Sequence, residues 1–190
     1  MENKYIEKEK TEKTVKSKEI KIDKIIWAKV RENAKLPTKR IEDAGYDVYI
    51  CPDKKEYILH PGDIQLFPTG IASAFPEGNI AIIKERGSTG SKGMSVRMGI
   101  VDSGYRNEWV IGINNTSSNK IAITSDLSHW ENRNHFHHTR YTVYDINKAM
   151  AQVIFVPEAI LESADQFITF DKLKEMKSER GTGKLGSTGK

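Results

Sequence analysis

The sequence predicts an all-β fold of the sandwich or barrel class. From Ile20 onward, short runs rich in isoleucine and valine alternate with glycine and proline. The clearest runs are IKIDKIIWAKV, GYDVYI, WVIGIN, KIAIT and AQVIFVPEAIL, and Pro-Gly, Glu-Gly or Asn-Asn turns punctuate the chain. Such runs are typical of strands. No alternating βαβ series is expected, and helical periodicity is weak except in residues 161–176, where we expect a turn or two of helix.

The bulk composition indicates one soluble domain. The chain has 190 residues, of which 37% are hydrophobic and 29% are charged. No window approaches the roughly 18 apolar residues of a membrane helix, so no membrane span is expected. The first twenty residues lack the apolar stretch of a secretory signal, which favours the cytoplasm. A single cysteine, Cys51, cannot form an internal disulfide or a zinc site alone, and we expect catalysis not to depend on it.

Three segments are expected along the chain: a charged N-terminal extension at 1–19, a β-barrel domain at 20–170 and a C-terminal arm at 171–190. The extension alternates lysine with glutamate, which predicts a solubilising arm and argues against nucleic-acid binding despite the net charge of +4. The last eleven residues, RGTGKLGSTGK, are rich in glycine and phosphate-binding side chains. They are therefore expected to form an arm that orders on a ligand.

Residues 126–147 interrupt the rhythm of strands. This stretch holds four of the five histidines and lies between two strand-like runs, so it is predicted to be an inserted loop or hairpin. His135, His137 and His138 with His129 are candidates for a Zn²⁺ or Ni²⁺ site, since imidazole suits both metals. Their spacing matches no recognised ligand pattern, which favours a solvated hairpin.

Three glycine-rich polar segments are candidates for phosphate binding: AGYD at 44–47, ERGSTGSKG at 85–93, and RGTGKLGSTG from Arg180. Each can offer backbone N–H groups to an anion, because glycine permits the positive φ angles that turn successive amides inward as a nest. None has the Walker A spacing, so a P-loop nucleotidase is disfavoured.

A fourth segment, RMGIVDSGYRNEW at 97–109, carries a carboxylate after an apolar run, then a tight Ser-Gly turn and an exposed aromatic residue. Taken alone, Asp102 is an ordinary turn former. Tyr105 taken alone is a core tyrosine at a strand end, and Arg86 a partner in a surface ion pair with Glu85 or Glu108.

The order of these segments resembles the five motifs of the trimeric dUTPase family. AGYD resembles motif one, RGSTGSKG motif two, GIVDSGYRNE motif three, AQVIFVP with Gln152 motif four, and RGTGKLGSTG motif five. The resemblance extends from about Ile20 to the last residue, and motifs three and five are specific. It implies a distorted jelly-roll β-barrel, a homotrimer with shared active sites, and hydrolysis of dUTP to dUMP and pyrophosphate with Mg²⁺.

The resemblance also implies a role for each site residue. Asp102 is the general base that activates water for attack on the α-phosphate, and Tyr105 packs beneath the deoxyribose. Asp47 holds Mg²⁺ through water. The backbone of 99–101 reads uracil, within a substrate-binding set of Arg86, Gly87, Ser88, Thr89, Gly99, Ile100, Val101, Gln152, Arg180, Leu185, Gly186, Ser187 and Thr188.

Several positions depart from the family pattern. Leu185 stands where a stacking phenylalanine is usual, Gly87 where a serine usually follows the motif-two arginine, and Lys184 where motif five has glycine. Ala149 occupies the place of the motif-four arginine, with Lys148 beside it. These changes weaken single contacts and leave Asp102 and Tyr105 in place.

Two further functions stay open. The related dCTP deaminases share this fold, but they place a catalytic glutamate in the strand after motif three, where this chain has Gly112. Without that acid, deamination lacks its proton shuttle. Some phage dUTPases carry an extra segment at the position of the insert, where it takes part in binding a regulatory protein. The insert at 126–147 is therefore also a candidate protein-binding module.

Overall fold

The structure is a computed structural model that describes residues 22–136, 141–159 and 168–178. The chain divides into two compact units, 1–158 and 159–190, and each is described by itself. The predicted N-terminal extension and motif five lie outside the described residues. The predicted boundary at residue 170 stays a prediction, because 160–167 are not described.

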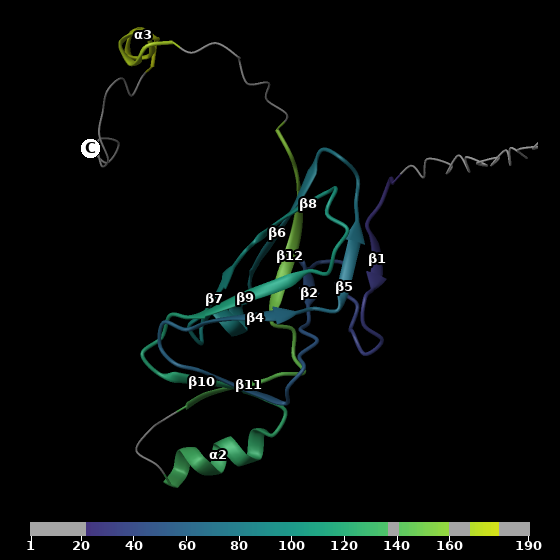
Figure 1. Cartoon of the computed structure of the whole chain (residues 1–190), viewed down its shortest axis with the longest axis vertical. Coiled ribbons are helices and arrows are strands. Elements are labelled where there is room, and N and C mark those ends of the chain that lie inside the picture. The colour runs from purple at the N-terminus through teal and green to yellow at the C-terminus, as the bar shows by residue number, and fades with distance from the viewer. Residues whose placement is uncertain (1–21, 137–140, 160–167, 179–190) are drawn as a thin grey trace, which may run out of the picture. The chain divides into compact units, whose positions relative to one another are not determined.

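The predicted all-β class is confirmed in the first unit (Figure 1). One sheet has the order β2-β12-β6-β8, and the others have the orders β4-β9-β7, β11-β10-β3 and β1-β5. The strands are β1 (Ile26–Lys29), β2 (Tyr46–Val48), β3 (Glu56–Leu59), β4 (Ile64–Pro68), β5 (Ile71–Ala74), β6 (Asn79–Glu85), β7 (Met94–Arg97), β8 (Ile100–Asp102), β9 (Val110–Asn115), β10 (Lys120–Thr124), β11 (Tyr141–Asp145) and β12 (Ala151–Pro157).

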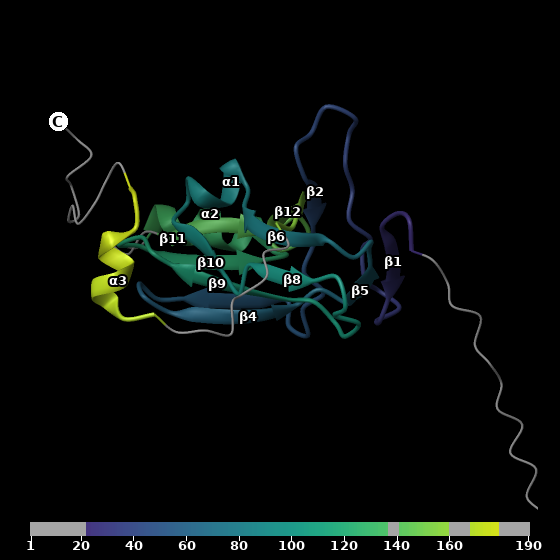
Figure 2. The same ribbon diagram turned by 90° about the horizontal axis from the view of Figure 1, so that it is seen from above.

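The hydrophobic core lies between the sheets. Figure 2 shows β4 and β9 on one side of the unit and β6 and β12 on the other. Phe67 of β4, Ile111 of β9, Ile83 of β6 and Val153 of β12 are all buried in one cluster. The isoleucine- and valine-rich runs read from the sequence thus supply the strands that enclose this core.

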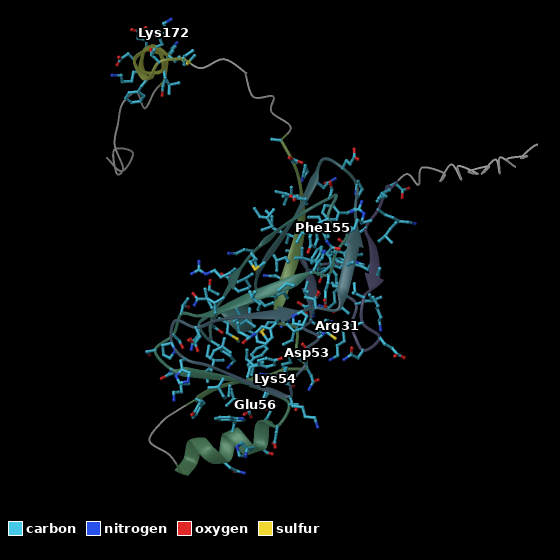
Figure 3. All side chains as sticks on the ribbon, viewed as in Figure 1. Arg31, Asp53, Lys54, Glu56, Phe155 and Lys172 are labelled. Atoms are coloured by element: carbon cyan, nitrogen blue, oxygen red, sulfur yellow. The ribbon has the colours of Figure 1, made fainter. Side chains whose placement is uncertain are left out.

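Trp109 belongs to the core. Its side chain is 1% exposed, and its ring packs edge-on against Trp27 at 5.2 Å between centroids. Phe155, labelled in Figure 3, also packs edge-on against Trp27, at 6.1 Å between centroids. Aromatic pairs of this geometry add to the stabilisation from burial alone. Trp109 therefore anchors the segment that follows Asp102 to the core.

The insert is not a loop or hairpin. Its first part forms helix α2 (Leu127–Phe136), and its last part is β11, which pairs with β10 in parallel. Parallel neighbours cannot be joined by a tight turn, so the chain must cross over between them. The sequence showed no βαβ unit because α2 has no apolar stripe, and the helix is held by other contacts.

Trp130 attaches α2 to the sheet. Its side chain is 4% exposed, its indole Nε1 donates to the Glu56 carboxylate, and its ring packs against Tyr141 at 4.5 Å between centroids. Asp126 caps the start of the helix by accepting from the backbone N–H of His129 at 3.1 Å. Figure 3 shows Glu56 beside α2. One aromatic anchor and one cap thus replace an amphipathic face.

In the second unit, α3 (Phe170–Glu175) falls within the stretch where a short helix was predicted. The Thr169 hydroxyl accepts from the Lys172 backbone N–H at 3.3 Å and caps it. Among the helices in the described parts of the chain, none has the length and apolar character needed to cross a membrane.

Candidate active site

Strand β12 brings motifs one, two and four together. Gln152 lies opposite Asp47 of β2 on one side and opposite Lys84 of β6 on the other. Gly45, just before β2, permits this approach, because a Cβ at that position would lie 2.7 Å from the Val153 carbonyl oxygen. Residues far apart in the sequence thereby meet where these strands begin or end.

Motif two forms one turn of helix, α1 (Gly87–Gly90), where a nest of amides with positive φ was expected. The Arg86 backbone N–H donates to the Thr89 hydroxyl at 2.9 Å, and that hydroxyl donates to the Arg86 carbonyl at 3.0 Å. Thr89 is fully buried, so its side chain builds the turn, while Gly87 and Ser88 are exposed.

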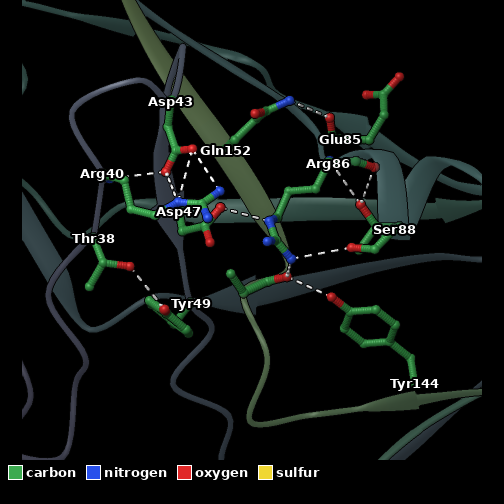
Figure 4. A network of polar contacts seen from close by, with 12 residues as sticks. Thr38, Arg40, Asp43, Asp47, Tyr49, Glu85, Arg86, Ser88, Tyr144 and Gln152 are labelled. Carbon is green, nitrogen blue, oxygen red and sulfur yellow. Dashed lines mark hydrogen bonds and ion pairs between the residues drawn. The ribbon is translucent and has the colours of Figure 1, made fainter.

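Arg86 is the centre of the polar network in Figure 4. Its Nε donates to Asp47 Oδ1 at 2.6 Å, and its Nη1 donates to Ser88 Oγ at 3.2 Å and to the Ala149 carbonyl at 3.3 Å. The interpretation of Arg86 as a surface partner of Glu85 or Glu108 was wrong. Glu108 instead pairs with Arg31 at 2.9 Å.

A pocket of about 670 Å³ opens over this network. Gln152 lines it and donates from Nε2 to the Glu85 carbonyl at 3.0 Å, which fixes the amide against β6. The lining residues are Thr38, Lys39, Arg40, Asp43, Ala44, Gly45, Asp47, Arg86, Gly87, Ser88 and Gln152. The predicted metal residue and much of the predicted phosphate-binding set thus share one pocket.

The loop before motif one was not predicted to belong to the site. Lys39 and Arg40 line the pocket, and Arg40 pairs with Asp43 at 2.9 Å. The side-chain and backbone hydrogen bonds from Arg40 hold the pKa of Asp43 below its ordinary value. The signal in the sequence was the Lys-Arg pair four residues before AGYD. Together with Arg86, these two side chains give three cations around the pocket, which favours an anionic ligand.

Asp102 and Tyr105 lie at the other end of β6. Asp102 ends β8 opposite Ile80 and is exposed, and its backbone carbonyl accepts from the Tyr105 backbone N–H at 3.0 Å in the expected turn. Tyr105 is 40% exposed, so its interpretation as a core residue was wrong. Ile80 and Glu85 are five residues apart on β6, which is about 17 Å at the usual rise per residue. One chain therefore does not bring Asp102 into the pocket.

The segment predicted to read uracil is strand β8 with the residue before it. Gly99 accepts from the Ile83 N–H at 2.6 Å, and a Cβ on Gly99 would meet the Ile83 carbonyl at 2.7 Å. Ile100 is 66% exposed. Because β8 is the last strand of its sheet, its outer backbone groups have no strand partner among the described residues. Such groups can hydrogen-bond a planar ligand edge.

Comparison with known proteins identifies the family. The dUTPase family model matches residues 32–126. The deoxyuridine 5'-triphosphate nucleotidohydrolase of Clostridium tetani is 32% identical over 166 residues, covering 85% of this chain and 93% of the relative. The chain belongs to the dUTPase family. The enzyme of the same name from Mycolicibacterium gilvum is 31% identical over 159 residues, or 81% of this chain and 87% of that relative.

Solved dUTPases of staphylococcal phages have the same fold. The dUTPase of Staphylococcus bacteriophage 80alpha, solved with dUpNHpp, superposes with a TM-score of 0.59 at 23% identity, covering 86% of this chain and 96% of that one. The dUTPase of phage phi11 of S. aureus, described with a species-specific insert, gives a TM-score of 0.55 at 22% identity, over 78% and 100%. The jelly-roll prediction is confirmed.

Part of this dUTPase's predicted site lies outside the described residues. The motif-five residues are Arg180, Leu185, Gly186, Ser187 and Thr188. Of the four insert histidines, only His129 has a described side chain, so the Zn²⁺ or Ni²⁺ hypothesis is untested. No group of three potential metal ligands is found among the residues that the structure describes.

Proposed function

We propose that this dUTPase splits dUTP into dUMP and pyrophosphate in active sites that neighbouring chains of a homotrimer share. The observation that carries the proposal is the separation of the two half-sites within one chain. The pocket around Arg86 is assembled by a single chain, whereas Asp102 lies about 17 Å away along β6. A closed ring of identical subunits brings the β8 end of one chain to the pocket of the next.

The pocket binds the triphosphate. Arg86, Ser88 and the exposed amides at the start of α1 supply charge-assisted hydrogen bonds, and Gln152 positions the chain from β12. Lys39 and Arg40 at the rim add positive charge.

In this proposal Asp47 is the carboxylate that holds Mg²⁺ through water. Arg86 occupies Oδ1, Oδ2 accepts no hydrogen bond from the described residues, and Asp47 lines the pocket. A single carboxylate fits Mg²⁺ that is held through its waters, since this ion keeps much of its hydration shell. The bound ion would neutralise charge on the leaving pyrophosphate.

Residues at the β8 end supply the general base and select deoxyuridine. Asp102 accepts a proton from water as the water oxygen bonds to the α-phosphorus and the bond to pyrophosphate breaks. Tyr105 packs beneath the deoxyribose, and the backbone of 99–101 pairs with uracil. The motif-five arm then closes over the phosphates through Arg180, Ser187 and Thr188.

Exposed apolar side chains support an assembly of chains. Ile64 and Leu66 of β4 are 59% and 50% exposed, and Met98 and Ile100 near β8 are 59% and 66% exposed. Apolar surface of this kind is typical of an interaction site. Light scattering of the purified protein is expected to give the mass of three chains.

Subunit mixing tests the shared site. Assayed at a dUTP concentration below the wild-type KM, Asp102→Asn and Arg86→Ala chains are each expected to form trimers with little turnover. After refolding an equal mixture, random assortment gives both native residues in about a quarter of shared sites, so about a quarter of wild-type turnover returns. No recovery, in trimers shown to be mixed, would place both residues in one chain's site.

A substrate panel tests the chemistry. Pyrophosphate release with dUTP, UTP, dCTP and dTTP, with and without Mg²⁺, is expected to show strong preference for dUTP and dependence on the ion. Gly112 of β9 pairs with Leu66 and Arg97, so β9 has no carboxylate where the deaminases are expected to place their catalytic glutamate. Release of ammonia from dCTP would restore the deaminase alternative.

We also propose that the insert at 126–147 binds a regulatory protein. Ser128, His129 and Asn132 are exposed on α2, while Trp130 anchors the helix. The dUTPase of Staphylococcus bacteriophage 80alpha is described as controlling the transfer of virulence genes. A helix added to one edge of the barrel offers a separate surface for such contacts.

Testing the insert requires a replacement of equal length. Deleting residues 128–139 would leave too little chain to cross from β10 to a parallel β11. Replacing these residues with a glycine-serine linker of the same length is expected to keep dUTP hydrolysis and to remove any co-purifying protein partner. Loss of hydrolysis would instead show that the insert is structural.

A further inference from the structure

The carbonyl oxygen of Ala149 accepts two hydrogen bonds inside the site. Arg86 Nη1 donates to it at 3.3 Å, and the Tyr144 hydroxyl donates to it at 2.6 Å (Figure 4). Ala149 and Tyr144 are each 3% exposed. A carbonyl has two lone pairs, so both bonds can form together. The short loop between β11 and β12 is thereby tied to the pocket arginine.

We propose that Tyr144 is a positioning residue that holds the guanidinium of Arg86 in place for the phosphate chain through the Ala149 carbonyl. The inference rests on the proposed phosphate-binding role of Arg86. That side chain is held at three points, by Asp47, by Ser88 and by Ala149. Asp47 and Ser88 hold it through side chains that the proposed ligand or its metal also contacts. The Ala149 carbonyl is the anchor that neither ligand nor metal contacts, and Tyr144 holds this carbonyl through its own hydrogen bond.

The environment of Tyr144 suits this task. Its ring belongs to the buried core, and burial raises the pKa of its hydroxyl, against a smaller lowering by nearby Ser88 and Arg86. The hydroxyl therefore remains a proton donor at neutral pH. Ala149 itself has no polar side chain in a place where the family usually has arginine, so only its backbone reaches Arg86.

The test is Tyr144→Phe, which keeps the ring and removes the hydroxyl. Its KM for dUTP is expected to rise about fivefold, the effect of one lost hydrogen bond, with kcat within about twofold of wild type. Tyr57→Phe is the matched control. Tyr57 also belongs to the β11-β10-β3 sheet, where it is half-buried, but its hydroxyl accepts from the Lys54 backbone N–H, away from the pocket. Its KM is expected to stay at the wild-type value.

A double-mutant cycle separates positioning from general destabilisation. In an Arg86→Ala background, Tyr144→Phe is expected to leave KM unchanged, because the residue it positions is gone. An equal rise of KM in both backgrounds, or no rise in the single variant, would overturn the inference alone. An Arg86→Ala enzyme with the wild-type KM would overturn the phosphate role of Arg86 and this inference with it.

Discussion

The two ends of β6 present opposite kinds of surface. At the Glu85 end, Arg86 and Asp47 are 29% and 32% exposed and bonded to each other, and Gln152 is fixed to the backbone. At the Ile80 end, Asp102 is exposed and Tyr105 is 40% exposed. One chain thus pre-organises the groups proposed to bind the triphosphate, and leaves the proposed base exposed to solvent.

This difference has a physical reason. Donors that stabilise a polyanion are most effective when they are already oriented, since no reorganisation is then needed during the reaction. A base needs a ligand and a water beside it before its orientation matters. In the proposed homotrimer the two halves lie on different chains, and the following changes test each half.

The largest expected effect is that of Asp102→Asn. Turnover of dUTP should fall about 10³-fold, within the range for removal of a general base, while the affinity for dUpNHpp changes little. Steady-state kinetics and calorimetric titration measure the two quantities. Asp53→Asn, which alters a 74% exposed carboxylate paired with Arg31, is the control and should retain full turnover. Comparable turnover in both variants would remove Asp102 from the chemistry.

At the other half-site, Arg86→Lys should raise KM for dUTP about 30-fold with a smaller change in kcat. An ammonium group cannot reproduce the fork that reaches Asp47 and Ala149 at once. Arg31→Lys changes a forked arginine bonded to Glu108 and Asp53 instead. That variant should lose stability and keep its KM. A normal KM in Arg86→Lys would mean that charge alone suffices in the pocket.

The close approach that builds the pocket can be tested by stability. Gly45→Ala places a Cβ 2.7 Å from the Val153 carbonyl, and such overpacking should cost about 2 kcal/mol of unfolding free energy. A fall in Tm of roughly 6 °C is expected for a chain of this size. Gly87→Ala meets no atom within 4 Å and should melt within about 1 °C of wild type. Equal melting of both variants would refute the close packing at Gly45.

The smallest expected effect is on alkaline stability. Burial raises the pKa of Tyr144 above its ordinary value of 10.0, so above that pH the unfolded chain releases a proton that the folded chain retains. The contribution is complete below pH 10 and is lost as pH rises through the folded pKa. Denaturant titrations should show a steeper alkaline fall for wild type than for Tyr144→Phe. Parallel curves would mean that the hydroxyl does not influence folding.

Local patterns were sufficient for the fold class and for part of the site. Isoleucine- and valine-rich runs predicted the strands, because the preference of β-branched residues for extended backbone is a local property. The turn at Asp102 and the position of Gln152 in a strand also follow from neighbouring residues. The resemblance to dUTPases likewise depended on the order of short motifs.

Helix α2 escaped prediction because its evidence is not local. Its sequence has no apolar stripe. The contacts that hold it run from Trp130 to Glu56 of β3 and to Tyr141 of β11. The packing of Trp109 against Trp27 likewise joins residues far apart in the sequence.

The sequence by itself determined the strands, the glycine-rich turns and the order of motifs that places this chain among dUTPases. Only the tertiary structure decided that Arg86 pairs with Asp47, that Tyr144 reaches Ala149, and that Asp102 stands at the far end of β6. The physical reason is that strand register and side-chain partnership depend on packing between distant segments. Those contacts exist only once the sheets have formed.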